Sequence, residues 1–447
     1  MKELDYFNPN KDNYFNIFTF TLNLNFSIEK MDLNTYSLFV HEYTHYIQSI
    51  GTINGIALLF KYFSFVKNVY LDINDKICDD QEYELDYLTK YSSQYDEIKN
   101  LYNYTITKKN TNNWPDLFLS YEKFFHPIFK KEVIEYFITL GDEDYHISQK
   151  CLRETMAMMT FFHARNYSIN QAVNYLNQDT IKPIYKILFL YFVNKYPYID
   201  DHFIFLYYFC EIALQTDSPN EILDKLFQTI RYQPKNSRIK TEVFLSRFQR
   251  ENPQFFTRLG FLVEKFKKEI VKLNLLGINN EYFTAAHEYL KRCIIALNEY
   301  LKKLTFINSF TNIETLKELS KKILSPIIIQ NFCNQIKVST LDDQTNKYEL
   351  ALVFGVSQLL EGYINIKDGI TPSHKKCIFF DDIPICQFAK SLTHADFDIN
   401  ICLRKPFYIK PFHDGNCIFY NSSLVIGMLP DEEINKYKKT TRKYVKN

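Results

Sequence analysis

The residues that interrupt regular secondary structure are scarce in this chain, which holds only 10 glycines and 14 prolines among 447 residues. Aromatic residues are abundant instead, with 34 tyrosines and 40 phenylalanines. Long apolar segments with so few interruptions are typical of helices that pack through large side chains. We therefore predict a mainly α-helical protein with a small β element, that is, an α+β fold.

The charge balance argues against a general attraction to polyanions, because 53 basic and 52 acidic residues leave a net charge of only +1. No field over the whole molecule would draw it to nucleic acid or to an anionic membrane. The 9 cysteines form no dense framework, as is usual for thiols in a reducing compartment. Residues 1–14 lack the apolar core of a secretory signal, and the apolar runs are shorter than the roughly 20 residues of a membrane span. We expect a soluble, cytoplasmic protein without a transmembrane segment.

A strand pattern and a helix pattern follow one another near the N-terminus. Apolar and polar residues alternate over residues 18–28, which is the period of a half-buried strand. A helical pattern comes next, with Asp32 or Asn34 placed to cap it and Gly51 placed to end it. Later helices are predicted at residues 131–140, 148–165 and 201–215.

The predicted helix near the N-terminus contains His41-Glu42-Tyr43-Thr44-His45, which is an HExxH element. Residues four apart lie one turn above each other with Cβ atoms roughly 5–6 Å apart, so both imidazoles can bind one ion. Glu42 is rotated about 100° around the helix and falls beside that ion, where it can accept a proton from water. Zinc suits this arrangement, because it lowers the pKa of a bound water and polarises a carbonyl group.

The surroundings of the motif favour a metal site over two ordinary histidines on a helix surface. The neighbours of the motif over residues 38–47 include no proline and no charged residue besides Glu42. Such a charge would compete with the ion. In the similar pair His287-Glu288, Lys291 replaces the second histidine, so we predict an ordinary helix surface there.

The HExxH segment resembles the active-site helix of the zincin metallopeptidases. The strand before it resembles the edge strand on which those enzymes bind extended substrates, and the resemblance covers roughly the first 50 residues. It implies zinc as the cofactor, His41 and His45 as metal ligands, and Glu42 as the general base. Gln48 and Gly51 stand where the metzincin branch has glycine and histidine, so the resemblance is to the gluzincin branch.

The gluzincin resemblance implies a third ligand, a glutamate on a later helix. Glu154 is preferred, because its apolar neighbours make a carboxylate costly to bury unless a cation meets it, and Ala157 lets the two helices approach closely. Two alternatives are a surface ion pair between Lys150 and Glu154 and a ligand role for Glu211 instead. Gln48 shares the face of the ligands and is either a partner of the metal centre or polar surface.

These inferences give a domain plan and a function. The resemblance implies a zincin-like core over residues 1–216, and we predict a helical region over residues 217–363 and an irregular or β-containing unit over residues 364–447. The implied reaction is zinc-dependent hydrolysis of a peptide bond in an intracellular protein or peptide, with a regulatory protein as a second kind of partner. The alternative is a helical interaction or sensor protein with a structural metal or an inactive motif.

The C-terminal unit holds a weaker pattern for a structural zinc site, because soft ligands gather there without a standard spacing. Buried free thiols are the competing interpretation. The residues concerned are His374, Cys377, Cys386, His394, Cys402, His413 and Cys417.

Overall fold

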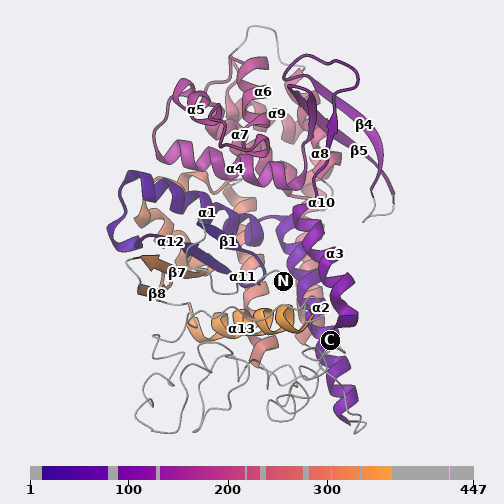
Figure 1. The fold of residues 1–447 in the computed structure, drawn as a ribbon, viewed down its shortest axis with the longest axis vertical. Helices are drawn as coiled ribbons and strands as arrows, with labels where there is room; N and C mark the ends of the chain where they lie inside the picture. The colour runs from indigo at the N-terminus through magenta and orange to yellow at the C-terminus, as the bar shows by residue number, and fades with distance from the viewer. Residues whose placement is uncertain are drawn as a thin grey trace, which may run out of the picture.

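The structure is a computed structural model and describes residues 13–78, 89–126, 131–216, 219–231, 238–274, 281–303, 305–332, 335–343, 345–364 and 422. Within these ranges the chain is mostly helical with two small sheets, as predicted (Figure 1). The helices are α1 (Leu33–Gly51), α2 (Ile53–Cys78), α3 (Ser92–Asn103), α4 (Gln149–Ala164), α5 (Ile169–Leu176), α6 (Ile187–Lys195), α7 (His202–Leu214), α8 (Pro219–Arg231), α9 (Thr241–Glu251), α10 (Pro253–Asn274), α11 (Glu281–Lys303), α12 (Ile313–Ile323) and α13 (Lys347–Ile364).

Two four-stranded sheets accompany the helices. The first has the order β1-β2-β7-β8, in which β2 runs parallel to β7 and the other pairs are antiparallel. The second has the order β3-β6-β5-β4 and is antiparallel throughout. The strands are β1 (Tyr14–Asn16), β2 (Thr21–Leu24), β3 (Thr107–Lys109), β4 (Leu119–His126), β5 (Lys131–Leu140), β6 (Glu143–His146), β7 (Ile327–Phe332) and β8 (Gln335–Ser339).

The expectation of an edge strand over residues 18–28 is wrong. Only Thr21–Leu24 form a strand there, and this strand pairs with β1 on one side and β7 on the other. Phe20 has a φ of +52°, which breaks the extended backbone before the strand. The outer strand β1 lies before the alternating segment, and both β1 and β2 contact α1.

The ends of the predicted helices around the motif are confirmed. Asp32 caps α1 by accepting a hydrogen bond from the N–H of Thr35, and Gly51 is its last residue. The predicted helices at residues 148–165 and 201–215 are present as α4 and α7, and the side chains of Ser148 and Asp201 cap them in the same way. Short polar side chains at these positions satisfy N–H groups that the first turn of a helix leaves unpaired.

Two local predictions are wrong in whole or in part. Residues 131–140 form strand β5 rather than a helix, and residues 135–139 are all buried, so both faces of the second half of this strand are covered. A short run that is apolar on both faces does not distinguish a strand from a helix by its period. In the pair His287-Glu288, Glu288 is exposed as predicted, but His287 is buried, with only 7% of its surface exposed.

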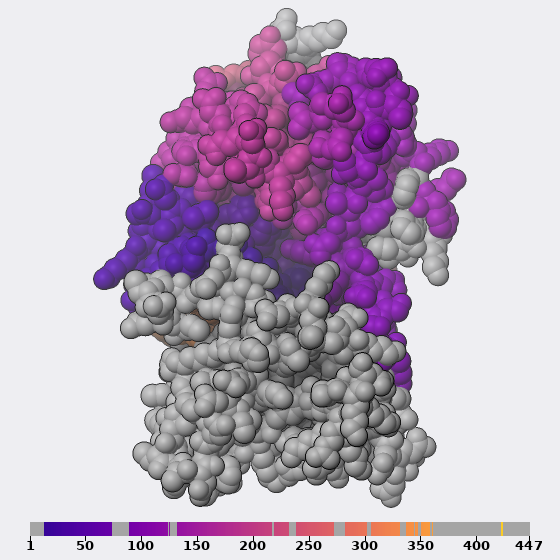
Figure 2. All heavy atoms as spheres, viewed as in Figure 1, coloured from indigo at the N-terminus to yellow at the C-terminus, as the bar shows by residue number. Residues whose placement is uncertain are grey.

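Helix α1 is enclosed by segments from distant parts of the sequence. It lies beside α4 in Figure 1, and Thr44 of α1 shares a 2.8 Å hydrogen bond with Thr160 of α4. On another side the Tyr43 hydroxyl is 2.7 Å from the Ser320 hydroxyl of α12. Figure 2 shows the indigo N-terminal segments and the magenta middle of the chain in direct contact on this face. The HExxH helix is therefore a central element of the core.

No single helix in the described ranges is long and apolar enough to cross a membrane. Helices α1 and α2 pass a test of length and composition only when taken together, and they are bent by 73° relative to each other. A side-chain clamp holds this bend: Gln215 of α7 donates to the carbonyl of Gly51 and accepts from the N–H of Ile53.

Gly55 allows α2 to start close against the end of α1. A Cβ atom at this position would lie 2.2 Å from the carbonyl oxygen of Gln48 and 2.6 Å from the Cα of Ser49, and both are backbone atoms. We expect Gly55→Ala to destabilise the protein by about 1 to 3 kcal/mol or more, because the helices must separate. The free energy of unfolding from urea titration measures this.

Gly260 provides the matched control for that substitution. A Cβ atom at Gly260 of α10 meets nothing within 4 Å. Gly260→Ala is therefore expected to stabilise the protein by up to about 1 kcal/mol, through helix propensity alone. Equal effects of the two substitutions would contradict the role given to Gly55.

Candidate metal centre

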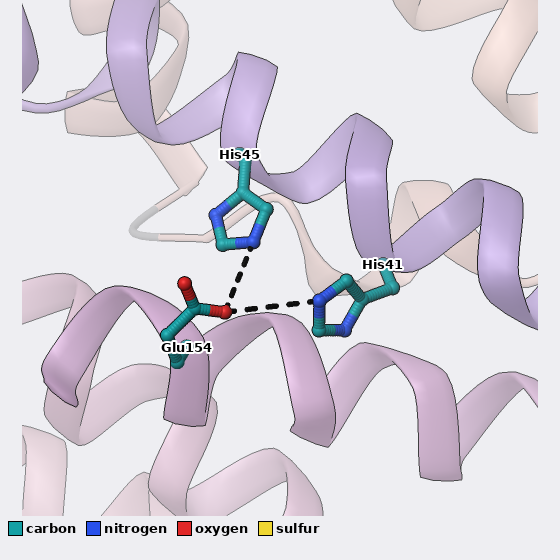
Figure 3. A group of neighbouring side chains, drawn as sticks. All are labelled: His41, His45 and Glu154. Atoms are coloured by element: carbon teal, nitrogen blue, oxygen red, sulfur yellow. Dashed lines mark ion pairs between the residues drawn. The ribbon is translucent and has the colours of Figure 1, made fainter. Parts of the chain in front are cut away.

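Two helices bring the predicted ligands together although they are far apart in the sequence. His41 and His45 project from α1, Glu154 projects from the facing side of α4, and the three side chains point at one another (Figure 3). Glu154 Oε2 is 3.3 Å from Nε2 of His45 and 3.8 Å from Nε2 of His41. One donor atom from each residue lies within 4.8 Å of the others. A tetrahedral ion about 2.1 Å from its ligands spaces them roughly 3.4 Å apart, so this group is close enough to bind a metal ion.

The outer side of each imidazole is held by a partner. His45 Nδ1 is 3.0 Å from the amide oxygen of Gln48, and the amide nitrogen of Gln48 donates to the carbonyl of Arg153 on α4. The His41 imidazole is hydrogen-bonded to the backbone of Ala157. Such bonds fix the tautomer and turn Nε2 toward the ion in metal sites. Gln48 is therefore a partner of the centre and not polar surface.

The two histidines differ in protonation. Burial and the nearby His45 lower the pKa of His41 to about 4, so its Nε2 lone pair is free. Burial acts to lower the pKa of His45 as well, but the charge and hydrogen bond of Glu154 outweigh it and raise this pKa to about 9. Burial acts to raise the pKa of Glu154, and the charge of His45 brings it below its usual value. In the metal-free protein a proton on His45 thus bridges His45 and Glu154, in the place that a metal ion would occupy.

Glu42 lies beside the group and not within it. Its Oε1 is 4.0 Å from Nε2 of His41, and the three-donor cluster does not include it. The backbone of Phe15 on β1 is hydrogen-bonded to the carboxylate. Burial raises the pKa of Glu42 to about 8, against an opposing effect of His45. A carboxyl group with a pKa near neutrality can both accept and return a proton.

Arg153 is a neighbour of the candidate metal centre that the sequence did not indicate. Its side chain is buried beside Glu154, Nη2 donates to Oδ1 of Asn54 on α2, and the guanidinium lies 4.3 Å over the ring of Tyr102 on α3. Burial raises the pKa of the Tyr102 hydroxyl to about 12, Arg153 acts to lower it, and the charges of Glu154 and Glu42 add to the increase. Tyr102 therefore lies within electrostatic reach of the Arg153 guanidinium and of the two carboxylates.

Tyr185 is a second neighbour of the centre that sequence reasoning missed. It ends the short helical turn η3 (Pro183–Tyr185), and its ring centroid is 6.4 Å from that of His41. Burial raises the pKa of its hydroxyl above the usual range, and the charges of Glu154 and Glu42 add to this, so the group remains a protonated donor. No residue pattern separates this tyrosine from the other 33, because only packing brings it to the centre.

Glu211, the alternative third ligand, does not join the two histidines. It is buried in α7, where it accepts a 3.2 Å hydrogen bond from the Tyr207 hydroxyl, and burial holds its pKa well above the usual value. Glu154 occupies the facing position on α4 instead, where the charges of His45 and His41 act on it more strongly than that of Lys150. The cysteine-rich pattern at residues 374–417 lies outside the described residues.

Metal binding at this centre is expected to depend steeply on pH. His45 carries a proton below about pH 9 in the metal-free protein, and an ion must displace this proton. We expect the apparent zinc affinity to fall about tenfold for each unit of pH below that value, with release of at least about one proton. Calorimetry in buffers of different ionisation enthalpy, from about pH 6 to 8.5, measures both quantities. An affinity that does not change over this range would contradict the protonation assigned to His45.

The donor set is chemically suited to zinc. Two imidazoles and one carboxylate are typical protein ligands of this ion where an open position is kept for water or substrate. Within the described part of the chain these three residues are the group that satisfies the spacing. Comparisons with known protein families, with curated proteins and with solved structures found no match to this chain.

Proposed function

We propose that this chain is a zinc-dependent metallopeptidase of the gluzincin type, with its catalytic centre between α1 and α4. The observation that supports this most strongly is the convergence of His41, His45 and Glu154 with a carboxylate, Glu42, beside them and not among them. A three-ligand set leaves a position for water or substrate, whereas structural zinc sites have four protein ligands. The proposed substrate is a peptide or protein, and the proposed reaction is hydrolysis of a peptide bond.

Each residue of the centre has a role in this proposal. When bound, zinc supplies an acidified water molecule and polarises the carbonyl group under attack. Glu42 accepts the proton of the attacking water at its carboxylate and delivers it to the leaving amine nitrogen. The backbone of Phe15 keeps this carboxylate in place, while Gln48 and Ala157 hold the two imidazoles. These contacts reduce the reorganisation that the reaction requires.

Tyr185 completes the proposed site as a hydrogen-bond donor. Its hydroxyl is within electrostatic reach of Glu42 and Glu154 and stays protonated in the pH range of an enzyme. A neutral O–H next to the attacked carbonyl group stabilises negative charge as it develops on the oxygen. We assign this role to Tyr185 because its ring lies next to that of the ligand His41.

The proposal predicts about one zinc ion per chain, because the described residues form one group with the required spacing. Elemental analysis of protein purified without chelators gives the stoichiometry, and incubation with a peptide library read by mass spectrometry gives the cleavage. A stoichiometry near zero that added zinc does not restore would contradict the metal assignment. Full zinc occupancy without cleavage of any peptide or protein would favour the alternative of an interaction or sensor protein.

A further inference from the structure

Arg153 is a buried cation that the proposed reaction does not use. Only 3% of its surface is exposed, and it forms no ion pair with a carboxylate among the described residues. Nη2 donates to Asn54, but Nη1 has no hydrogen-bond partner. Burying a charged group with a donor unpaired is unfavourable.

A purely structural role leaves this arrangement unexplained. The backbone carbonyl of Arg153 receives the hydrogen bond from Gln48, and any residue at this position would provide that carbonyl. The stacking on Tyr102, a hydrogen bond with the Tyr102 side chain and the bond to Asn54 use only part of the guanidinium, which has five N–H donors in a planar fork. The fork of an arginine matches the two oxygens of a carboxylate. The free part of this fork therefore has the chemistry of a carboxylate receptor.

The position of Arg153 agrees with this assignment. Arg153 directly precedes Glu154, the proposed ligand, on α4. Its guanidinium lies over the ring of Tyr102, and that ring is within electrostatic reach of Glu154 and Glu42. A carboxylate bound to the guanidinium would therefore lie next to the candidate metal centre.

We propose that Arg153, with Asn54 and Tyr102, is an anchor for a carboxylate of the peptide substrate. This inference rests on the proposed peptidase function and gives it a substrate class, namely peptides with a carboxylate next to the bond that is cleaved. The carboxylate is either the C-terminus of the peptide or an acidic side chain. The ring of Tyr102, 4.3 Å from the guanidinium, is itself only half-buried.

Binding of matched peptides to the zinc-loaded Glu42→Gln protein tests the proposal without cleavage. The probes are acetylated tetra-alanine with a free C-terminus, the same peptide as a carboxamide, and a carboxamide with glutamate as its last residue. Calorimetry is expected to show about 10- to 100-fold tighter binding of a probe that carries a carboxylate than of the neutral one, which is the range for hydrogen bonds to charged groups. The two charged probes distinguish a C-terminal carboxylate from a side-chain carboxylate.

Arg165, at the C-terminal end of the same helix, offers a matched control. Like Arg153, it bonds to an asparagine, Asn34, and lies 4.9 Å over a tyrosine ring, that of Tyr167, but it caps the other end of α4. Arg153→Met in the Glu42→Gln protein is expected to abolish the preference for a carboxylate, and Arg165→Met is expected to keep it. Arg153→Lys keeps the charge without the planar fork and is expected to retain part of the preference for a carboxylate. This variant replaces Arg153→Met in the test if Arg153→Met does not fold.

The zinc ion itself can hold a carboxylate, so the same titrations are repeated with metal-free protein. A preference that persists without zinc supports the anchor. Equal binding of acid and carboxamide by the parent would overturn the proposal, and so would a preference that survives Arg153→Met and disappears with the metal. Zinc content and peptide cleavage are measured separately, so carboxylate binding without cleavage would reject the peptidase function and leave the anchor standing.

Discussion

Replacing Glu42 by glutamine is expected to slow peptide hydrolysis by about 100- to 10,000-fold, which is the usual loss when general-base assistance is removed. The amide keeps the shape of the side chain but cannot accept a proton from the attacking water. Glu42 is not one of the three donors within 4.8 Å of each other, so zinc content and fold are expected to remain. The rate with any peptide that the parent cleaves, determined by mass spectrometry, gives the result.

Two measurements make this substitution informative. Elemental analysis must show the same zinc content in both proteins, because loss of metal would also abolish activity. A zinc-loaded Glu42→Gln protein that cleaves as fast as the parent would show that Glu42 is not the base. His41→Ala does not answer this question, because it removes a ligand and a general base cannot be identified from such a loss.

Glu154→Ala is expected to weaken zinc binding by more than about 100-fold. Changes to the partners that merely orient ligands cost about 10- to 100-fold in metal affinity, and Glu154 is itself the carboxylate that faces both histidines. The substitution also removes the hydrogen bond of His45, so its pKa is expected to fall. Competition with a chelator of known affinity measures the change.

Glu211→Gln is the matched control, because Glu211 is also a buried helical glutamate that follows the motif. Burial raises the pKa of its carboxyl group well above the usual value, so an amide is a close substitute and zinc binding should not change. Gln48→Ala is expected to give an intermediate loss of about 10- to 100-fold, since it frees the outer side of the His45 ring. Loss of the metal from Glu211→Gln but not from Glu154→Ala would reverse the ligand assignment.

The local part of the centre could be predicted from the sequence. The spacing of His41 and His45 places both imidazoles on one face wherever a helix forms, because the helical period is a property of the backbone. Asp32 and Gly51 fix the ends of that helix through capping and termination, which also act within a few residues. The third ligand was implied by the gluzincin resemblance, and Glu154 was preferred for that role because a carboxylate among apolar neighbours needs a cation or donors.

Period alone was insufficient where both faces of a segment are covered. Residues 131–140 were predicted as a helix and form strand β5, since burial on both faces removes the alternation that marks a strand. The strand at residues 21–24 was predicted to lie at an edge. Its partner β7 comes from the far end of the described chain, and a local pattern carries no information about such pairing.

The sequence by itself determined the chemistry that one helix can offer, namely two imidazoles and a carboxylate beside them. The tertiary structure decided what meets that helix. Packing of α4 on α1 brings Glu154, rather than Glu211, to the histidines and lets the carbonyl of Arg153 hold Gln48 across 105 residues of sequence. Such contacts depend on the shapes and burial of side chains from several helices at once. The periodicity of a single segment shows which of its faces is buried, but not which other segment packs against that face.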